Sequence, residues 1–151
     1  MESSALFSNT TGDLNTASGV QALASSTTGN ANTASGSGAL LNNTTGSFNT
    51  ANGRLALHFN TTGDFNTAIG FGADVSAVNL TNATAIGNGT FVNASNKIRL
   101  GNTQVTVIEG QVAFTAVSDK TKKENFQRVD GEEVLGKMAK ATPPAESVRS
   151  L

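Results

Sequence analysis

The repeat TTGDLNTASGVQALASS at residues 10–26 is followed by TTGNANTASGSGALLNN (27–43), TTGSFNTANGRLALHFN (44–60) and TTGDFNTAIGFGAD (61–74). The four units share the pattern T-T-G-x-x-N-T-A-x-G-x-x-A-L and follow one another without a gap, except that Asp74 replaces the final leucine. Half-matches lie one period away on both sides, at Ala5-Leu6 and at Thr84-Ala85-Ile86-Gly87. Residues 1–95 are therefore an array of 17-residue repeats.

A repeat of this length predicts one coil of a narrow parallel β-solenoid. Helical and four-stranded repeats need periods of roughly 20–50 residues, so a shorter unit favours short strands joined by tight corners. Two glycine positions in each unit indicate two corners, since glycine adopts positive φ without steric cost. Coils stacked about 4.8 Å apart would align equivalent Asn and Thr side chains in ladders, each bonded to its copies above and below. The expected fold class is all-β, a parallel β-roll over residues 1–95.

The interior predicted for these coils is thin. Alanine dominates it, and we expect the few larger apolar residues to fill the rest: Leu14, Leu23, Leu40, Phe48, Leu57, Phe65 and Ile69. The first 95 residues also carry only five charges: Glu2, Asp13, Arg54, Asp64 and Asp74. Coils with so little core and so few charges are expected to pack against identical chains, which predicts an obligate homo-oligomer.

The composition narrows the classes of protein to consider. Thr, Asn and Gly number 20, 17 and 16 and together exceed a third of the 151 residues, which suits strands and turns and excludes a helical bundle. The net charge of −1 gives little of the repulsion that is typical of disorder. The absence of cysteine excludes disulfides, thiolate metal sites and a cysteine nucleophile. A single histidine, His58, leaves no multi-histidine zinc site and no Ser-His-Asp triad within one chain.

Other functional classes are also disfavoured. His58 lies at a repeat edge, where we expect a packing residue, and the three aspartates of the array do not cluster in sequence. We therefore expect no metal site and no cofactor. No run approaches the roughly 18 apolar residues of a membrane span, and MESSALFSNTTG at the start lacks the basic and apolar regions of a signal peptide. Basic patches with interleaved aromatic residues are missing, which disfavours nucleic acid as a partner.

Within the array, NTAIGFGA (66–73) and NATAIGNGT (82–90) resemble the head repeats of trimeric autotransporter adhesins and of related phage and viral fibre proteins. SNKIRLGN (95–102) resembles the segment that closes such heads and leads into the stalk, so the likeness covers about residues 5–102. The resemblance implies a left-handed parallel β-roll assembled as a homotrimer. It also implies an extracellular location, on a cell surface or in a virion fibre.

A different module begins near residue 96, because all but five of the charged side chains (10 Lys+Arg and 11 Asp+Glu in the whole chain) follow residue 95. Apolar residues alternate over 104–117 around Glu109-Gly110, which predicts a β-hairpin. Asp130 then reads as the N-cap of a helix that ends before Pro143-Pro144. We divide the rest of the chain into a neck or strand connector (96–117), a further module (118–140) and a flexible tail (141–151).

The segment AVSDKTKKENF (116–126) resembles the start of the intramolecular chaperone domain of endosialidase-type phage tailspikes and fibres, a self-cleaving peptidase family. VDGEEVLGKMAK (129–140) resembles the first helix of that domain, so the likeness covers about residues 104–140. The residues that match the family signature are Ser118, Asp119, Lys123 and Asn125, whereas Thr121 stands where arginine is usual.

This second resemblance implies that Ser118 attacks the bond to Asp119 with Lys123 as base, once three chains have assembled. A lysine whose pKa is lowered by burial or by neighbouring cations can activate a hydroxyl in this way. The family domain is much longer than the stretch that follows Ser118 here (119–151), so we expect no cleavage in this form of the chain.

The sequence thus favours a structural segment of a homotrimeric surface adhesin or phage or virion tail fibre, with the opening part of a trimerisation chaperone behind it. One alternative is a self-processing serine peptidase that the repeats only present, with Ser118, Asp119 and Lys123 as its catalytic residues. The other is a carbohydrate-binding fibre head whose partners are host surface glycans or proteins. That alternative lacks the Trp and Tyr platforms that are common in sugar sites.

Overall fold

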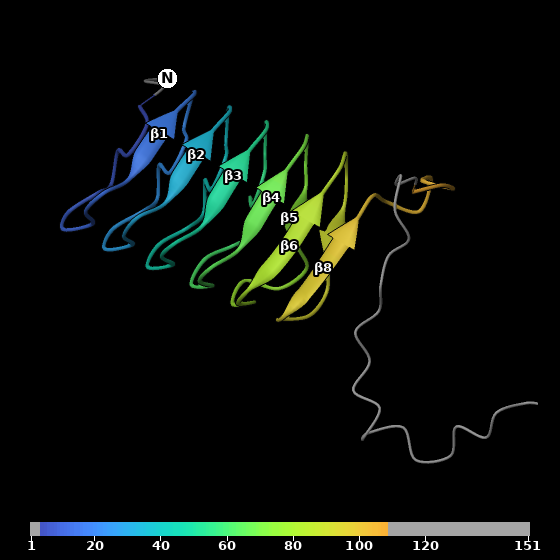
Figure 1. Ribbon diagram of the computed structural model, residues 1–151. Coiled ribbons are helices and arrows are strands. Elements are labelled where there is room, and N and C mark those ends of the chain that lie inside the picture. The colour runs from blue at the N-terminus through green and yellow to red at the C-terminus, as the bar shows by residue number, and fades with distance from the viewer. Residues whose placement is uncertain (1–3, 109–151) are drawn as a thin grey trace, which may run out of the picture. The chain divides into compact units, whose positions relative to one another are not determined.

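The computed structural model describes residues 4–108, and the elements of this part of the chain are strands and turns. Figure 1 shows a row of strands side by side, each followed by an excursion that brings the chain back to the next strand. The larger sheet has the order β1-β2-β3-β4-β6-β8, with bounds Thr16–Ser18, Thr33–Ser35, Thr50–Asn52, Thr67–Ile69, Ala83–Ile86 and Lys97–Leu100. A second sheet pairs β5 (Asp74–Val75) with β7 (Phe91–Val92). The predicted all-β parallel solenoid is confirmed for these residues.

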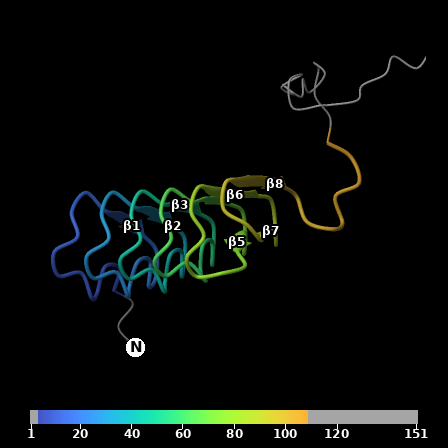
Figure 2. The same ribbon diagram turned by 90° about the horizontal axis from the view of Figure 1, so that it is seen from below.

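The register of the larger sheet reproduces the sequence repeat. Every pair of neighbouring strands is parallel, and Thr16 lies beside Thr33, which is itself beside Thr50. The same step continues through Thr67 and Thr84, and the last pairing joins Thr84 to Ile98 over a shorter stretch of chain. Seen from below, the chain forms successive turns of similar outline (Figure 2). β8 belongs to this sheet although it lies within the 96–117 segment.

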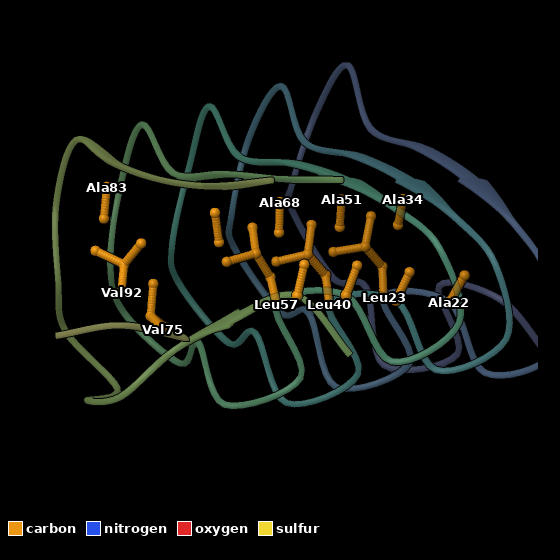
Figure 3. Packing of buried hydrophobic residues seen from close by; sticks show 14 residues of the cluster. Ala22, Leu23, Ala34, Leu40, Ala51, Leu57, Ala68, Val75, Ala83 and Val92 are labelled. Atoms are coloured by element: carbon orange, nitrogen blue, oxygen red, sulfur yellow. The ribbon is translucent and has the colours of Figure 1, made fainter. Parts of the chain in front are cut away.

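The core is a row of mostly small residues that runs along the inside of the coils. Alanines of the strands, such as Ala34 and Ala51, face the buried leucines Leu23, Leu40 and Leu57 of the opposite wall (Figure 3). These leucines have φ of 50–52°, a left-handed conformation that costs an ordinary residue about 1–2 kcal/mol. Complete burial of a leucine side chain contributes about 1.5–3 kcal/mol, which offsets that cost.

The expectation that every large apolar residue fills the interior is wrong for four of the seven. Leu14, Phe48, Phe65 and Ile69 are exposed, whereas the three leucines at the end of the repeat are buried. Exposure alternates along β3 and the two residues before it: Phe48, Thr50 and Asn52 are exposed, and Asn49 and Ala51 are buried. Small alanines suit a narrow coil, so the bulky side chains of the units lie outside it.

The predicted asparagine ladder is present. The side-chain Oδ1 of Asn32 accepts hydrogen bonds from the backbone N–H of Asn49 at 2.9 Å and from its Nδ2 at 3.1 Å. The Nδ2 of Asn49 also donates to the carbonyl of Gly63 at 2.8 Å. Asn15 and Asn66 take the equivalent places in the coils before and after. These buried amides replace part of the missing apolar core.

A second, shorter column lies beside the first. Asn60 donates from Nδ2 to Oδ1 of Asn43 at 2.9 Å, and each of the two also donates to the carbonyl of the next glycine along the chain. Ser26 occupies the same position one coil earlier, and its buried hydroxyl has no partner within residues 4–108. The threonine prediction needs correction: Thr27 and Thr44 donate to the backbone carbonyls of the next coil rather than to each other's side chains.

The two glycine columns have different roles. Gly36 at the end of β2 has φ of +132°, which fits the predicted corner. Gly29 lacks a positive φ, but a Cβ at this position would overlap the carbonyl oxygen of Gly46 in the next coil. Glycine is therefore required at position 29 because the coils stack closely there, and not because the chain makes a left-handed turn.

Candidate functional site

The residues predicted for catalysis, Ser118, Asp119 and Lys123, lie outside the described residues, as do the predicted hairpin turn at 109–110, the helix after Asp130 and the tail 141–151. Within residues 4–108 no group of three His, Cys, Asp or Glu side chains is placed to hold a metal ion. The candidate sites of the described part are therefore its exposed faces and one buried carboxylate.

The most distinctive surface is the outward side of the larger sheet, which we call the outer face. Two rows run along it, one residue per strand in each row, because alternate residues of every strand point outward. The first row is Thr16, Thr33, Thr50, Thr67, Thr84 and Ile98. The second row is Ser18, Ser35, Asn52, Ile69, Ile86 and Leu100.

The chemistry of the outer face changes along the solenoid. On β1, β2 and β3 the rows carry hydroxyl and amide side chains, whereas β4, β6 and β8 add Ile69, Ile86 and Leu100. All three are exposed, and Ile98 in the first row is 70% exposed. Aliphatic side chains in register on neighbouring strands form a continuous apolar strip on this part of the outer face.

The leading edge of the outer face is the column just before the strands: Leu14, Ala31, Phe48, Phe65, Asn82 and Asn96. All six have φ between 53° and 60°. Leu14 is 86% exposed, and the rings of Phe48 and Phe65 stack at 4.9 Å with an angle of 2° between their planes. A left-handed conformation is costly for leucine and phenylalanine, and exposure gives them no burial in return.

The trailing edge is the column just after the strands: Val20, Ser37, Arg54, Phe71 and Asn88. The Arg54 guanidinium carbon lies 5.4 Å from the centre of the Phe71 ring, a cation–π contact between neighbouring coils. Both edges therefore carry an aromatic ring beside β4, Phe65 before the strand and Phe71 after it.

A buried carboxylate lies on the opposite side of the coils. Asp74 is 2% exposed and accepts hydrogen bonds from the backbone N–H of Phe59 at 3.0 Å and of Val75 at 2.8 Å. Burial raises the pKa of Asp74 from 3.8 to about 6, while the backbone hydrogen bonds act in the opposite direction. In earlier coils the equivalent N–H groups, such as that of Ser25, donate to a backbone carbonyl one coil ahead. Asp74 thus takes over a backbone hydrogen bond where the leucine column ends.

His58 and the rings around it adjoin this carboxylate. The side-chain amide of Asn42 donates to the His58 carbonyl at 2.9 Å, and the imidazole meets the Phe59 ring edge-on at 5.7 Å. The Nδ1 of His58 has no hydrogen-bond partner within residues 4–108. The contacts agree with the expectation that His58 is a packing residue.

Two of these features were missed in the sequence. The second asparagine column was visible as Asn9, Asn43 and Asn60, each directly before a Thr-Thr-Gly corner. The outer position of Phe48 and Phe65 followed from alternation with Ala51 and Ala68, and hydrophobicity alone suggested the reverse.

No protein-family model matches the chain, and comparisons with curated proteins and with solved structures give no significant match. Among the described residues, no helix has the length and apolar character that crossing a membrane requires.

Proposed function

We propose that this chain is a structural segment of a homotrimeric, extracellular fibre, either a surface adhesin or a phage or virion tail fibre. In this proposal residues 1–95 form a left-handed β-roll of the adhesin-head type, and residues 118–140 are the opening part of a trimerisation chaperone. The single observation that carries the proposal is the aliphatic strip of the outer face. Ile69, Ile86 and Leu100 lie in register there and are exposed in the isolated chain.

The strip indicates that a single chain leaves apolar surface in water that an assembly would bury. Exposed apolar side chains cost free energy in water, at about 25 cal/mol for each Å² left unburied. A partner that presents the same strip removes all copies from water at once, which is an advantage of symmetric assembly. The number of chains in the assembly, three, is taken from the resemblance of NTAIGFGA (66–73) to the head repeats of trimeric adhesins.

The test is the mass of the folded protein in solution. Light scattering should give three times 15.3 kDa for the natural chain. Ile69→Glu combined with Ile86→Glu places charges from all three chains in the interface and should yield monomers. Val78→Glu is the matched control, because Val78 is similarly exposed but lies away from the outer face. A natural chain that is monomeric at micromolar concentration contradicts the proposal.

A second function, self-processing, rests on the motif around Ser118 and Lys123. In this proposal the Ser118 hydroxyl attacks the peptide carbonyl that joins it to Asp119, and Lys123 takes the hydroxyl proton. The C–N bond breaks, the amine of Asp119 leaves with that proton, and water hydrolyses the resulting ester to free the Ser118 carboxylate. The intact mass of purified protein tests it: a fragment that begins at Asp119, lost on Ser118→Ala and on Lys123→Ala, supports self-processing. A purified chain that keeps its intact mass of 15.3 kDa does not process itself in this form.

A further inference from the structure

The two edges of the outer face differ in a way that makes them complementary. The leading edge carries Leu14, Phe48 and Phe65, which are exposed and left-handed, although Asn82 and Asn96 show that the same column accepts a side chain suited to that conformation. Conformation and solvent exposure thus both disfavour the three apolar residues in an isolated chain. A contact that buries them accounts for their presence.

Charge distinguishes the edges as well. Asp13 and Asp64 lie next to Leu14 and Phe65 of the leading edge, and the Asp64 carboxylate accepts the backbone N–H of Ser47. The trailing edge carries Arg54, which is the single cation among residues 4–96. A leading edge placed against a trailing edge therefore pairs opposite charges, whereas like edges would place aspartates together.

The dimensions of the outer face fit a closed ring of three. Packed sheets lie about 10 Å apart, so each of three sheets around an axis lies about 5 Å from it, and the triangle they enclose has sides of about 17 Å. The six steps from Leu14 to Val20 span at most about 20 Å at about 3.3 Å per residue, because the chain departs from an extended conformation at Leu14 and Gly19. Around such a triangle the chain runs in the same sense on every side. Each corner then joins the end of one strand to the start of a strand from the next chain.

We propose that the leading edge of each chain packs against the trailing edge of its neighbour at the same coil, with Phe48 and Phe65 against the neighbour's Arg54 and Phe71. This inference rests on the proposed homotrimer and adds the pairing of surfaces. The contact is heterologous and closes after three chains. Aromatic rings then cover one another at each corner, and the Arg54 guanidinium lies within reach of a ring and a carboxylate from the next chain.

Cysteine cross-linking tests the pairing cleanly, because the natural chain has no cysteine. Ala31 and Ser37 belong to opposite edges of the same coil, and both are small, so replacing them leaves the apolar contacts intact. Within one chain they are too far apart for a disulfide, which requires Cα atoms within about 7 Å. The full-length variant Ala31→Cys/Ser37→Cys should form covalent species of up to three chains on mild oxidation. Each single variant should form none.

The outcomes separate this inference from the proposed function. A trimeric mass without cross-links in the double variant overturns the edge pairing and leaves the trimer in place. Cross-links in either single variant mean that like edges meet, which also overturns it. A monomeric natural chain removes both proposals. The pair Leu14→Cys/Val20→Cys repeats the test one coil away, so a local folding defect at Ala31 or Ser37 does not decide the result.

Discussion

The coils of residues 10–60 and those of residues 61–102 share one backbone plan but differ inside and outside. The earlier coils keep the full repeat period, place a leucine at each inner corner and present hydroxyls on β1, β2 and β3. The later coils replace the leucine by Asp74, add the valines of β5 and β7, shorten the last step and present isoleucines outward. The earlier coils thus combine a leucine with buried asparagines, whereas the later coils rely on Asp74 and valines, and the chain passes from one kind of interior to the other near residue 74.

The largest effect is expected where the asparagine ladder is cut in the earlier coils. Asn49→Ala leaves the backbone N–H of Asn66 without its buried partner and removes the hydrogen bonds from Asn49 to Asn32 and Gly63, although the Gly63 carbonyl keeps its bond from Asn60. The orphaned N–H costs about 1–3 kcal/mol and each lost hydrogen bond about 0.5–1.5 kcal/mol, so the free energy of unfolding should fall by about 4 kcal/mol. Asn52→Ala, on the outer face of the same coil, is the control and should change it by less than about 1 kcal/mol. Denaturant titration measures both, and equal losses would refute the ladder.

Removal of a core leucine should have the next largest effect. Leu40→Ala keeps the left-handed backbone strain but removes a fully buried side chain, at a cost of about 3 kcal/mol. Val92→Ala is the matched change in the later coils and should cost about 1–2 kcal/mol, because fewer methyl groups are lost. The difference between the two unfolding free energies measures how much more the leucine column stabilises its coils. A larger loss at Val92 would reverse that ranking.

The Asp74 carboxylate predicts a pH dependence that belongs to the later coils. Its pKa in the folded chain is about 6 against 3.8 for an exposed aspartate, so the folded state holds the proton more tightly than the unfolded state between these values. The free energy of unfolding should therefore decrease as the pH rises from about 4 to about 7, by at most about 3 kcal/mol. Asp74→Asn removes this contribution and separates it from every other titrating group. Thermal unfolding of both chains across that range tests the sign, and identical pH profiles would contradict it.

The smallest predicted effect is a gain of stability. Ser26→Asn restores the second asparagine column between Asn9 and Asn43, and should raise the free energy of unfolding by about 1 kcal/mol through a new buried hydrogen bond. Ser25→Asn adds the same amide at a half-buried position and serves as control. If the two variants melt at the same temperature, the column contributes nothing specific.

The repeat in the sequence was enough to predict the spacing of the strands, the parallel register and the buried Asn column. These features follow from matching positions, which any stack of equal coils must align. The outer position of Phe48 was not predicted, because hydrophobicity and strand alternation give opposite answers there and alternation prevails in a narrow coil. The change at Asp74 is a single departure from the pattern. The departure is visible in the sequence. That the Asp74 carboxylate accepts the N–H of Phe59, where earlier coils use a backbone carbonyl, is seen only in the structure.

The regular register has a consequence for how such a protein changes over generations. Residues 10, 27 and 44 occupy equivalent positions in successive coils. A genetic exchange between two repeats therefore adds or removes whole repeats of the gene, and with them whole coils of the protein. After such an exchange the coils on its two sides stack directly on each other, with equivalent side chains still in register. Misaligned recombination thus alters the length of the solenoid in steps of about 4.8 Å and leaves the flanking coils as they were. Length is the property of this molecule that can vary with the least disturbance to its interior.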